Sequence, residues 1–277
     1  MLVFAYDGSL NGDWVAHYAA RFAVNTPERR LRLVHVHEAK PVSHLQERIA
    51  RIIDECRVLG VALETELVAP RGADVAARLL ECVPHGATLI AGTRARPRNT
   101  VFLAGTVAAR LLESGRLPVI AIRVVHPGVL GQPGSVLLPV AAPPRSAARA
   151  LFLLRLLGED LLRLHVLFVR ELPRLRLRGL RGKSAMRVLA EGRASVGAVE
   201  DALRTALAPR HFELDSSVVV SDDAPTEVLL HAVKHRSRLI CLDACERTSP
   251  SRLFYRDPIE RVLRDAPSDV AVYRSVD

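Results

Sequence analysis

Aromatic residues and long apolar runs are scarce in this chain of 277 residues, and each shortage excludes a class of protein. Phenylalanine, tryptophan and tyrosine make up 4% of the residues. The stacking platforms that bind single-stranded nucleic acid are therefore scarce, and we do not expect a nucleic-acid partner. No apolar run reaches the roughly 18–20 residues of a membrane span, so we expect no transmembrane segment. Hydrophobic residues still make up 49% of the chain, which argues against global disorder.

Cysteine is also rare, and the spacing of the four cysteines does not suggest a disulfide framework. Cys241 and Cys245 lack the partner pair that a structural zinc site needs. The N-terminus enters an alternating strand pattern directly, without the basic and apolar regions of a signal peptide. These absences predict a protein of the reducing cytoplasm.

Positive charge is abundant and comes almost entirely from arginine, because lysine occurs only at Lys40, Lys183 and Lys234. The formal net charge is +9. Two explanations stay open. The arginines form a solvated surface, or they serve an anionic partner such as nucleotide phosphate, nucleic acid or an anionic membrane surface.

Strand-like and helix-like patterns alternate through the first 125 residues, which predicts βαβ units and a parallel sheet. Apolar residues within 43–59 recur at helical spacing. The expected strands are 2–6, 31–37, 62–68, 87–91 and 118–124, and the expected helices are 11–24, 43–59, 73–82 and 106–115.

The pattern then starts again. Residues 126–134 are rich in proline and glycine and are interpreted as a linker between a domain at 1–125 and a domain at 135–277. Strands at 136–140, 162–169, 238–243 and 266–273 repeat the first, second, fourth and last strands of the first domain. The offset between the copies is 134 residues at the first strand, 130 if His35 matches His165, and 151 if Gly92 matches Asp243. The change in offset locates an insertion after the second strand of the second copy.

The loop after the fourth strand of the first domain carries the clearest functional signal. It places small residues at Gly92, Ala95 and Gly105, followed by Thr106, between a predicted strand and a predicted helix. Backbone N–H groups and a helix N-terminus at such a junction bind phosphate. The loop also carries three arginines whose forked donors can neutralise phosphate charge: Arg94, Arg96 and Arg98.

Four markers in this half resemble the universal stress protein family. The loop is similar to the family's Gly-x2-Gly-x9-Gly-Ser/Thr pattern, with Ala95 in place of the second glycine. The opening strand ends in Asp7-Gly-Ser, the second ends in His35-Val36, and the last is entered through Pro118-Val. The resemblance implies an α/β fold of two tandem domains, each a five-stranded parallel sheet of order 3-2-1-4-5 with helices on both faces. It also implies an intramolecular pseudo-dimer of the two domains, and a homodimer is a further expectation.

The resemblance implies that the first domain binds ATP, with or without Mg²⁺, or a related adenine nucleotide. Asp7 then contacts the adenine or ribose side, and Val36 offers backbone groups to the base. The phosphate loop comprises Gly92, Arg94, Ala95, Gly105 and Thr106. Each residue also has a structural explanation: Asp7 as a turn or helix-capping residue, the glycines for close packing, the arginines as solvated charges, and Val36 as a core residue.

Ala95 is the main departure from the family pattern. If the backbone there is left-handed, alanine costs roughly 1–2 kcal/mol relative to glycine. That corresponds to about tenfold in affinity if the whole cost falls on binding. We therefore expect weakened rather than excluded nucleotide binding, and the sequence leaves open whether the site is lost.

The second domain lacks this pattern. Ala141 stands at the position of Asp7, Asp243 at that of Gly92, and Glu246 at that of Ala95, while Asp257-Pro258 replaces Gly105-Thr106. The carboxylates would repel phosphate. We expect this domain to pair with the first one or to hold a different ligand.

A basic insertion near 170–187 distinguishes the second domain further. It is interpreted either as a mobile surface loop or as a docking segment for an acidic protein, an anionic lipid surface or nucleic acid. Its cationic residues are Arg170, Arg174, Arg176, Arg178, Arg181, Lys183 and Arg187.

The favoured function is a stress-response regulator that binds an adenine nucleotide through the first domain. No set of nucleophile, base and orienting group is evident, so we expect no enzyme activity beyond slow ATP hydrolysis. The alternative is an interaction or scaffold module that binds no nucleotide and acts through protein or other anionic partners. His231 and His235 have metal-compatible spacing on a predicted helix, but no third ligand is evident, so capping or solvated roles are expected.

Overall fold

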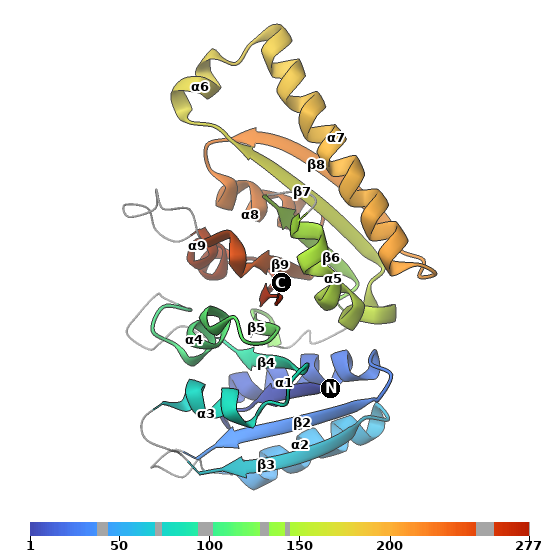
Figure 1. Cartoon of the computed structure of the whole chain (residues 1–277), viewed down its shortest axis with the longest axis vertical. Helices are drawn as coiled ribbons and strands as arrows, with labels where there is room; N and C mark the ends of the chain where they lie inside the picture. Colours follow the sequence, from blue (N-terminus) through green and yellow to red (C-terminus); the bar gives the residue numbers. More distant parts are fainter. Residues whose placement is uncertain are drawn as a thin grey trace. The chain divides into compact units, whose positions relative to one another are not determined.

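The chain folds into two compact units in the computed structural model (Figure 1). Unit 1 comprises Met1–Gly131 with Leu156–Gly158 and Tyr273–Asp277, and unit 2 comprises Gln132–Arg155 and Glu159–Val272. The division falls within the segment 126–134 that was interpreted as a linker. The structure describes residues 1–37, 44–69, 74–93, 102–127, 133–141, 145–247 and 258–276.

The strands of unit 1 follow the order β3-β2-β1-β4-β5, and every neighbouring pair is parallel. The order reverses at β1, which lies between β2 and β4. The core forms around β1, β4 and β5, which are nearly continuous apolar runs, as in parallel sheets that are buried on both faces. Phe4, Leu89 and Ile120 are fully buried. The elements are β1 (Leu2–Ala5), α1 (Leu10–Val24), β2 (Arg30–Val36), α2 (Leu45–Val58), β3 (Ala62–Val68), α3 (Val75–Cys82), β4 (Thr88–Gly92), α4 (Val107–Ser114) and β5 (Val119–Arg123).

Unit 2 repeats this order as β8-β7-β6-β9-β10, and its pairs β6–β7, β6–β9 and β7–β8 are parallel. The predicted α/β class is therefore confirmed. The elements are β6 (Ser135–Val140), α5 (Arg145–Leu157), β7 (Arg163–Glu171), α6 (Arg174–Gly179), α7 (Gly182–Leu207), β8 (Glu213–Ser221), α8 (Ala224–Lys234), β9 (Leu239–Asp243), α9 (Pro258–Asp265) and β10 (Asp269–Arg274).

Strand register shows which residues of the two units correspond. Leu2 pairs with Thr88 across β1 and β4, and Val136 pairs with Leu239 across β6 and β9. Counted from these pairs, the last residue of β4 corresponds to the last residue of β9. The match of Gly92 to Asp243 agrees with the sequence prediction.

The predicted match of His35 to His165 is wrong. With Leu2 matched to Val136, His165 lies level with Arg32, three residues before the position of His35. Phe168 takes the position of His35. The error arose because a His-Val pair occurs in both strands, although β7 has nine residues and β2 has seven.

The basic insertion is helical, so its interpretation as a loop is wrong. Residues 170–187 form the end of β7, α6 and the start of α7, which has 26 residues against 14 in α2. The buried residues of α7 recur at helical spacing only in its second part: Gly192, Val196, Val199, Leu203 and Leu207. The first part of α7 and all of α6 have no buried residue, and we call residues 174–191 the basic arm. Among the described residues, no helix is long and apolar enough to cross a membrane.

Candidate functional site

The carboxyl ends of the unit 1 strands bring several predicted site residues together. Ala5 pairs with Val34 on one side and Ala91 on the other. Asp7, Val36 and Gly92 follow these residues by one or two positions and therefore lie along the same edge, where the strand order reverses. In parallel α/β sheets this is the edge that holds ligands.

Asp7 begins the turn between β1 and α1 and is exposed. Its Oδ1 accepts the backbone N–H of Ser9 at 2.9 Å, and the Ser9 hydroxyl accepts the N–H of Gly12 at 3.0 Å as the N-cap of α1. A Cβ on Gly12 would come within 2.6 Å of Asp7 Oδ1, so the carboxylate lies against the first turn of α1. The predicted turn role is therefore present.

Gly92 allows α1 to approach the end of β4. A Cβ at this position would lie 3.1 Å from Asn11 Nδ2 and 3.4 Å from Val15 Cγ2. Close packing therefore accounts for the glycine, and it also places the Asn11 amide beside the site. Sequence reasoning missed Asn11; its position in the first turn of the helix after Asp-Gly-Ser was the available signal.

Gly105 and Thr106 begin α4. Gly105 has φ +71° with open space around its Cβ position, so glycine is needed there for its left-handed backbone. The Thr106 hydroxyl accepts the N–H of Ala109 at 3.2 Å and donates to the carbonyl of Leu103 at 2.7 Å. Its capping role is therefore present, whereas its proton is engaged by a carbonyl. The first-turn N–H groups of α4 supply the partial positive charge of a helix N-terminus.

A buried hydrogen bond ties β4 to the segment before α4. The Thr93 hydroxyl donates to the carbonyl of Phe102 at 2.5 Å, and the Thr93 N–H donates to the carbonyl of Ile122 at 2.8 Å. Both ends of the phosphate loop are thereby anchored. The rest of this loop lies outside the described residues, including Ala95 and the three arginines, Arg94, Arg96 and Arg98.

The second strand contributes structural residues to the edge. Val36 is buried with 6% exposure, as expected for a core residue. His35 is buried and donates Nδ1–H to the carbonyl of Tyr6 at 2.8 Å, which fixes the end of β1 against β2. The Tyr6 hydroxyl donates to Asp13 Oδ1 at 2.5 Å, and Arg48 pairs with the other oxygen of Asp13. Burial, together with the Asp13 carboxylate, raises the pKa of Tyr6 above its usual range.

The equivalent edge of unit 2 is chemically different. Asp243 is buried, and its Oδ2 accepts from Arg149 Nε at 2.5 Å while its Oδ1 accepts the N–H of Cys245 at 2.8 Å. The predicted phosphate-repelling carboxylate is therefore neutralised by an arginine of α5. Ala141 is exposed, Pro258 begins α9, and the Glu246 side chain and Asp257 are not among the described positions.

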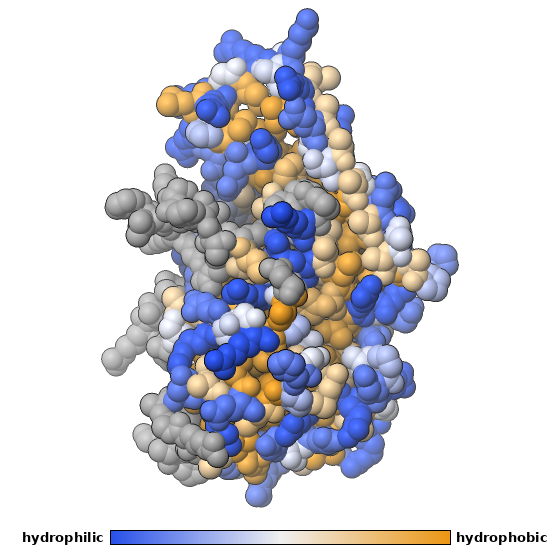
Figure 2. Space-filling view, viewed as in Figure 1, coloured by the Kyte–Doolittle hydropathy of each residue, from blue (hydrophilic) through white to orange (hydrophobic). Residues whose placement is uncertain are grey.

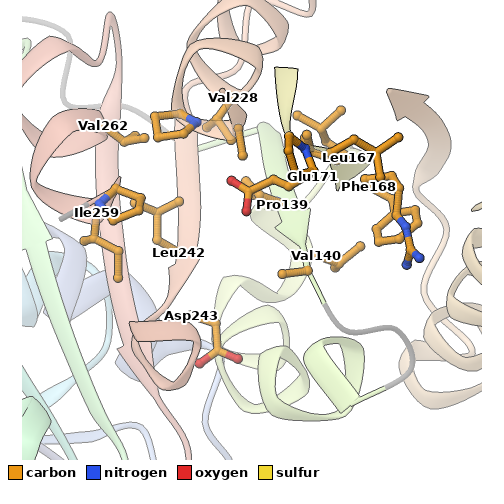
Figure 3. A pocket seen from close by; sticks show the side chains of 18 of the residues that line it. Pro139, Val140, Leu167, Phe168, Glu171, Val228, Leu242, Asp243, Ile259 and Val262 are labelled. Atoms are coloured by element: carbon orange, nitrogen blue, oxygen red, sulfur yellow. The ribbon is translucent and has the colours of Figure 1, made fainter. Parts of the chain in front are cut away.

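A cavity of about 420 Å³ lies at this edge of unit 2 (Figure 3). It is mainly apolar, and Phe168, at the position of His35, forms part of its wall. Glu171 and Arg176 also line it. The edge that is polar in unit 1 is therefore hollow and apolar in unit 2. The apolar residues labelled around the cavity include Val140, Leu167, Val228, Leu242, Ile259 and Val262.

Solved structures of other proteins have a similar fold. No family model and no curated protein sequence matches the chain. A universal stress protein from Archaeoglobus fulgidus DSM 4304 matches with a TM-score of 0.59 and 16% identity, over 100% of this chain and 96% of that one. A putative universal stress protein from Pseudomonas aeruginosa UCBPP-PA14 matches with a TM-score of 0.59 and 15% identity, over 98% and 92%.

A protein of a different kind has a similar fold. The cytoplasmic domain of a prokaryotic cation chloride cotransporter matches with a TM-score of 0.61 and 9% identity, over 99% of this chain and 95% of that one. Identities this low establish fold and leave activity open. The strand order and these similarities together show that the chain has the fold of universal stress proteins.

Proposed function

We propose that this chain is a tandem universal stress protein, a stress-response regulator that binds ATP or a related adenine nucleotide through unit 1. The observation that carries the proposal is the carboxyl edge of unit 1. There Asp7, Gly92 and the N-terminus of α4 lie at the reversal of strand order. In this proposal each unit is a five-stranded domain, the two form an intramolecular pseudo-dimer, and the protein acts in the cytoplasm.

The residues of this edge fit a nucleotide. The exposed Asp7 carboxylate can accept a ribose hydroxyl, and the backbone at Val36 can meet the base. The open space at Gly105 and the first turn of α4 suit phosphate oxygens. ATP would bring Mg²⁺ with its phosphates. Because we find no catalytic base at the described part of this edge, hydrolysis would be slow and the output would be a change of conformation or partner.

Calorimetry tests this proposal. Nucleotide-stripped protein is titrated with ATP and Mg²⁺, alongside Asp7→Ala and Gly105→Glu. Gly86→Glu is the matched control, because Gly86 has φ +76° and open space around it like Gly105 but precedes β4 at its other end. We expect binding near one equivalent, lost in both site variants and kept in the control. A wild-type chain that is folded by circular dichroism yet binds no ATP at millimolar concentration would contradict the proposal.

The basic arm favours a second candidate function, an interaction module that works without nucleotide. Leu175 is 84% exposed and Met186 is 70% exposed among arginines. Figure 2 shows apolar and hydrophilic residues side by side over α6 and the start of α7. This mixture suits an acidic protein partner with apolar contacts. An arm with Arg174, Arg176 and Arg178 changed to glutamate should then lose binding to an acidic peptide, and ATP should have no effect on that binding.

A further inference from the structure

Three histidines from two elements of unit 2 meet at the end of the strands opposite the carboxyl edge. His165 is the third residue of β7, His231 lies in the last turn of α8, and His235 is the C-cap of that helix. The ring centroids of His165 and His235 are 3.6 Å apart, and each lies 5.5 Å from that of His231. His231 and His235 share a helix face because they are four residues apart. The packing of α8 on β7 supplies the third histidine that the sequence did not reveal.

Each ring presents a buried nitrogen that has no hydrogen-bond partner among the residues that the structure describes. These atoms are Nε2 of His165, Nδ1 of His231 and Nε2 of His235. His165 is 5% exposed and His231 is 8% exposed. One buried polar atom without a partner already costs free energy, so three in one place call for a ligand. One ligand atom from each ring lies within 4.8 Å of the others.

Asp215 sets the tautomer of the first histidine. It is the cross-strand neighbour of His165, and its Oδ2 lies 3.2 Å from His165 Nδ1. Nδ1–H donates to the carboxylate, which leaves the buried Nε2 as the ring nitrogen with a free lone pair. A carboxylate behind a histidine is the usual second layer of a metal site, where it orients the ring and raises its basicity.

Burial disfavours the charged form of all three histidines. Burial, followed by the proximity of His235, lowers the pKa of His165 to about 4. Burial also lowers the pKa of His231 and His235 below the usual range, and Lys234 acts in the same direction on both. The Asp215 and Glu227 carboxylates act in the opposite direction. Neutral imidazoles keep the lone pairs that metal ions bind.

We propose that His165, His231 and His235 bind a divalent transition-metal ion of the Zn²⁺ class, with a fourth coordination position open to water. Nitrogen ligands at three corners of a tetrahedral zinc site lie about 3.4 Å apart. The three rings are now stacked, with ligand atoms within 4.8 Å of one another, so their side chains must rotate to close around an ion. The negative end of α8 at His235 favours a cation.

Access to the site is provided by a groove of about 540 Å³ between α7, β8 and α8. His231 and Lys234 line it together with Ser216 and Val218 of β8. The ion would tie β7 to α8 and stabilise unit 2 by an amount that grows with the logarithm of the ion concentration once this exceeds Kd. This site is independent of nucleotide binding, because the carboxyl edge of unit 1 contributes no residue to it.

The test uses the full chain without a histidine tag, stripped of metal with a chelator. Co²⁺ serves as the visible probe, and Zn²⁺ affinity is measured by displacement of Co²⁺ and by calorimetry. The variants are His231→Gln and His235→Gln, with His211→Gln as the control because His211 is exposed and outside the cluster. Asp215→Asn tests the orienting carboxylate.

We expect one Co²⁺ per chain with visible absorption, displacement by Zn²⁺, and a higher Tm with metal. Each cluster variant should lose at least about 100-fold in affinity, and Asp215→Asn about 10–100-fold. His211→Gln and Gly105→Glu should bind metal like the wild type. A folded metal-free chain that binds neither ion at one equivalent, or a His231→Gln variant with unchanged affinity, would overturn the proposal.

Discussion

The carboxyl edges of the two units share a strand order and differ in chemistry. Unit 1 presents Asp7, Gly92 and an exposed helix N-terminus, whereas unit 2 buries an ion pair, Arg149–Asp243, beside an apolar cavity. The comparison teaches that the sheet and the site depend on different residues. Apolar runs specify the central strands, and a few residues at the ends of these strands decide what the edge can bind.

The largest expected effect comes from breaking the ion pair of unit 2. Arg149→Met leaves the buried Asp243 carboxylate without its arginine partner, which should lower the free energy of unfolding by about 3–5 kcal/mol. The measurement is urea unfolding followed by circular dichroism. The double variant Arg149→Met with Asp243→Leu removes both charges and should recover most of the loss. If the double variant is as unstable as the single one, the pair is not what stabilises this edge.

A smaller effect is expected from two glycines of α7, the helix of unit 2 that is longer than its counterpart α2 in unit 1. A Cβ on Gly192 would lie 2.5 Å from Val218 Cγ1, so Gly192→Ala should cost about 1–3 kcal/mol of unfolding free energy. Gly197, on the same helix, has open space around it. Gly197→Ala should therefore stabilise by about 0.5–1 kcal/mol. Thermal unfolding of both variants checks the opposite signs; equal signs would mean that α7 does not pack as described.

The carboxyl edge of unit 1 can be disturbed without changing the residues proposed to contact nucleotide. Gly12→Ala places a Cβ against Asp7 Oδ1 and within 2.9 Å of Tyr6 Cε2, so the carboxylate must move. If unit 1 binds ATP as proposed, affinity should fall about tenfold, or 1.4 kcal/mol. Calorimetry measures this, with Gly197→Ala as a helical glycine control. Unchanged affinity would exclude the present position of Asp7 from binding.

The smallest effect concerns the start of α4. Thr106→Ala removes the side chain that caps Ala109 N–H, which should lower the free energy of unfolding by about 1 kcal/mol. Thr106→Ser keeps the hydroxyl and should stay close to the wild type. The corresponding helix of unit 2 begins at Pro258. Chemical denaturation of the two variants shows whether stability depends on the hydroxyl group or on the volume of the side chain.

Much of the fold could be predicted because it depends on local patterns. The strands expected at 2–6 and 87–91 are found at Leu2–Ala5 and Thr88–Gly92, since buried parallel strands are uninterrupted apolar runs. The predicted start of a helix at 106 agrees with Thr106 as the N-cap of α4, because capping depends only on neighbouring residues. The position of Asp7 came from the resemblance to a family, and Arg94 and Ala95 lie outside the described residues.

The features that sequence reasoning missed depend on contacts between distant segments. His165 joins His231 only because α8 packs on β7, and the two residues are far apart in the chain. Arg149 reaches Asp243 from another helix. The wrong match of His35 to His165 also arose because a shared His-Val pair does not reveal strand register, which depends on pairing between distant strands.

The Arg149–Asp243 pair also constrains how such a domain can change its ligand. Converting the edge of unit 2 into one like that of unit 1 requires glycine at position 243 and a replacement for Arg149. If Asp243 is replaced first, Arg149 loses its carboxylate partner. If Arg149 is replaced first, the buried Asp243 carboxylate loses its arginine partner. A protein with only one of the two substitutions should therefore be less stable than a protein with both or with neither. This loss of stability opposes a stepwise conversion of the unit 2 edge into one like that of unit 1.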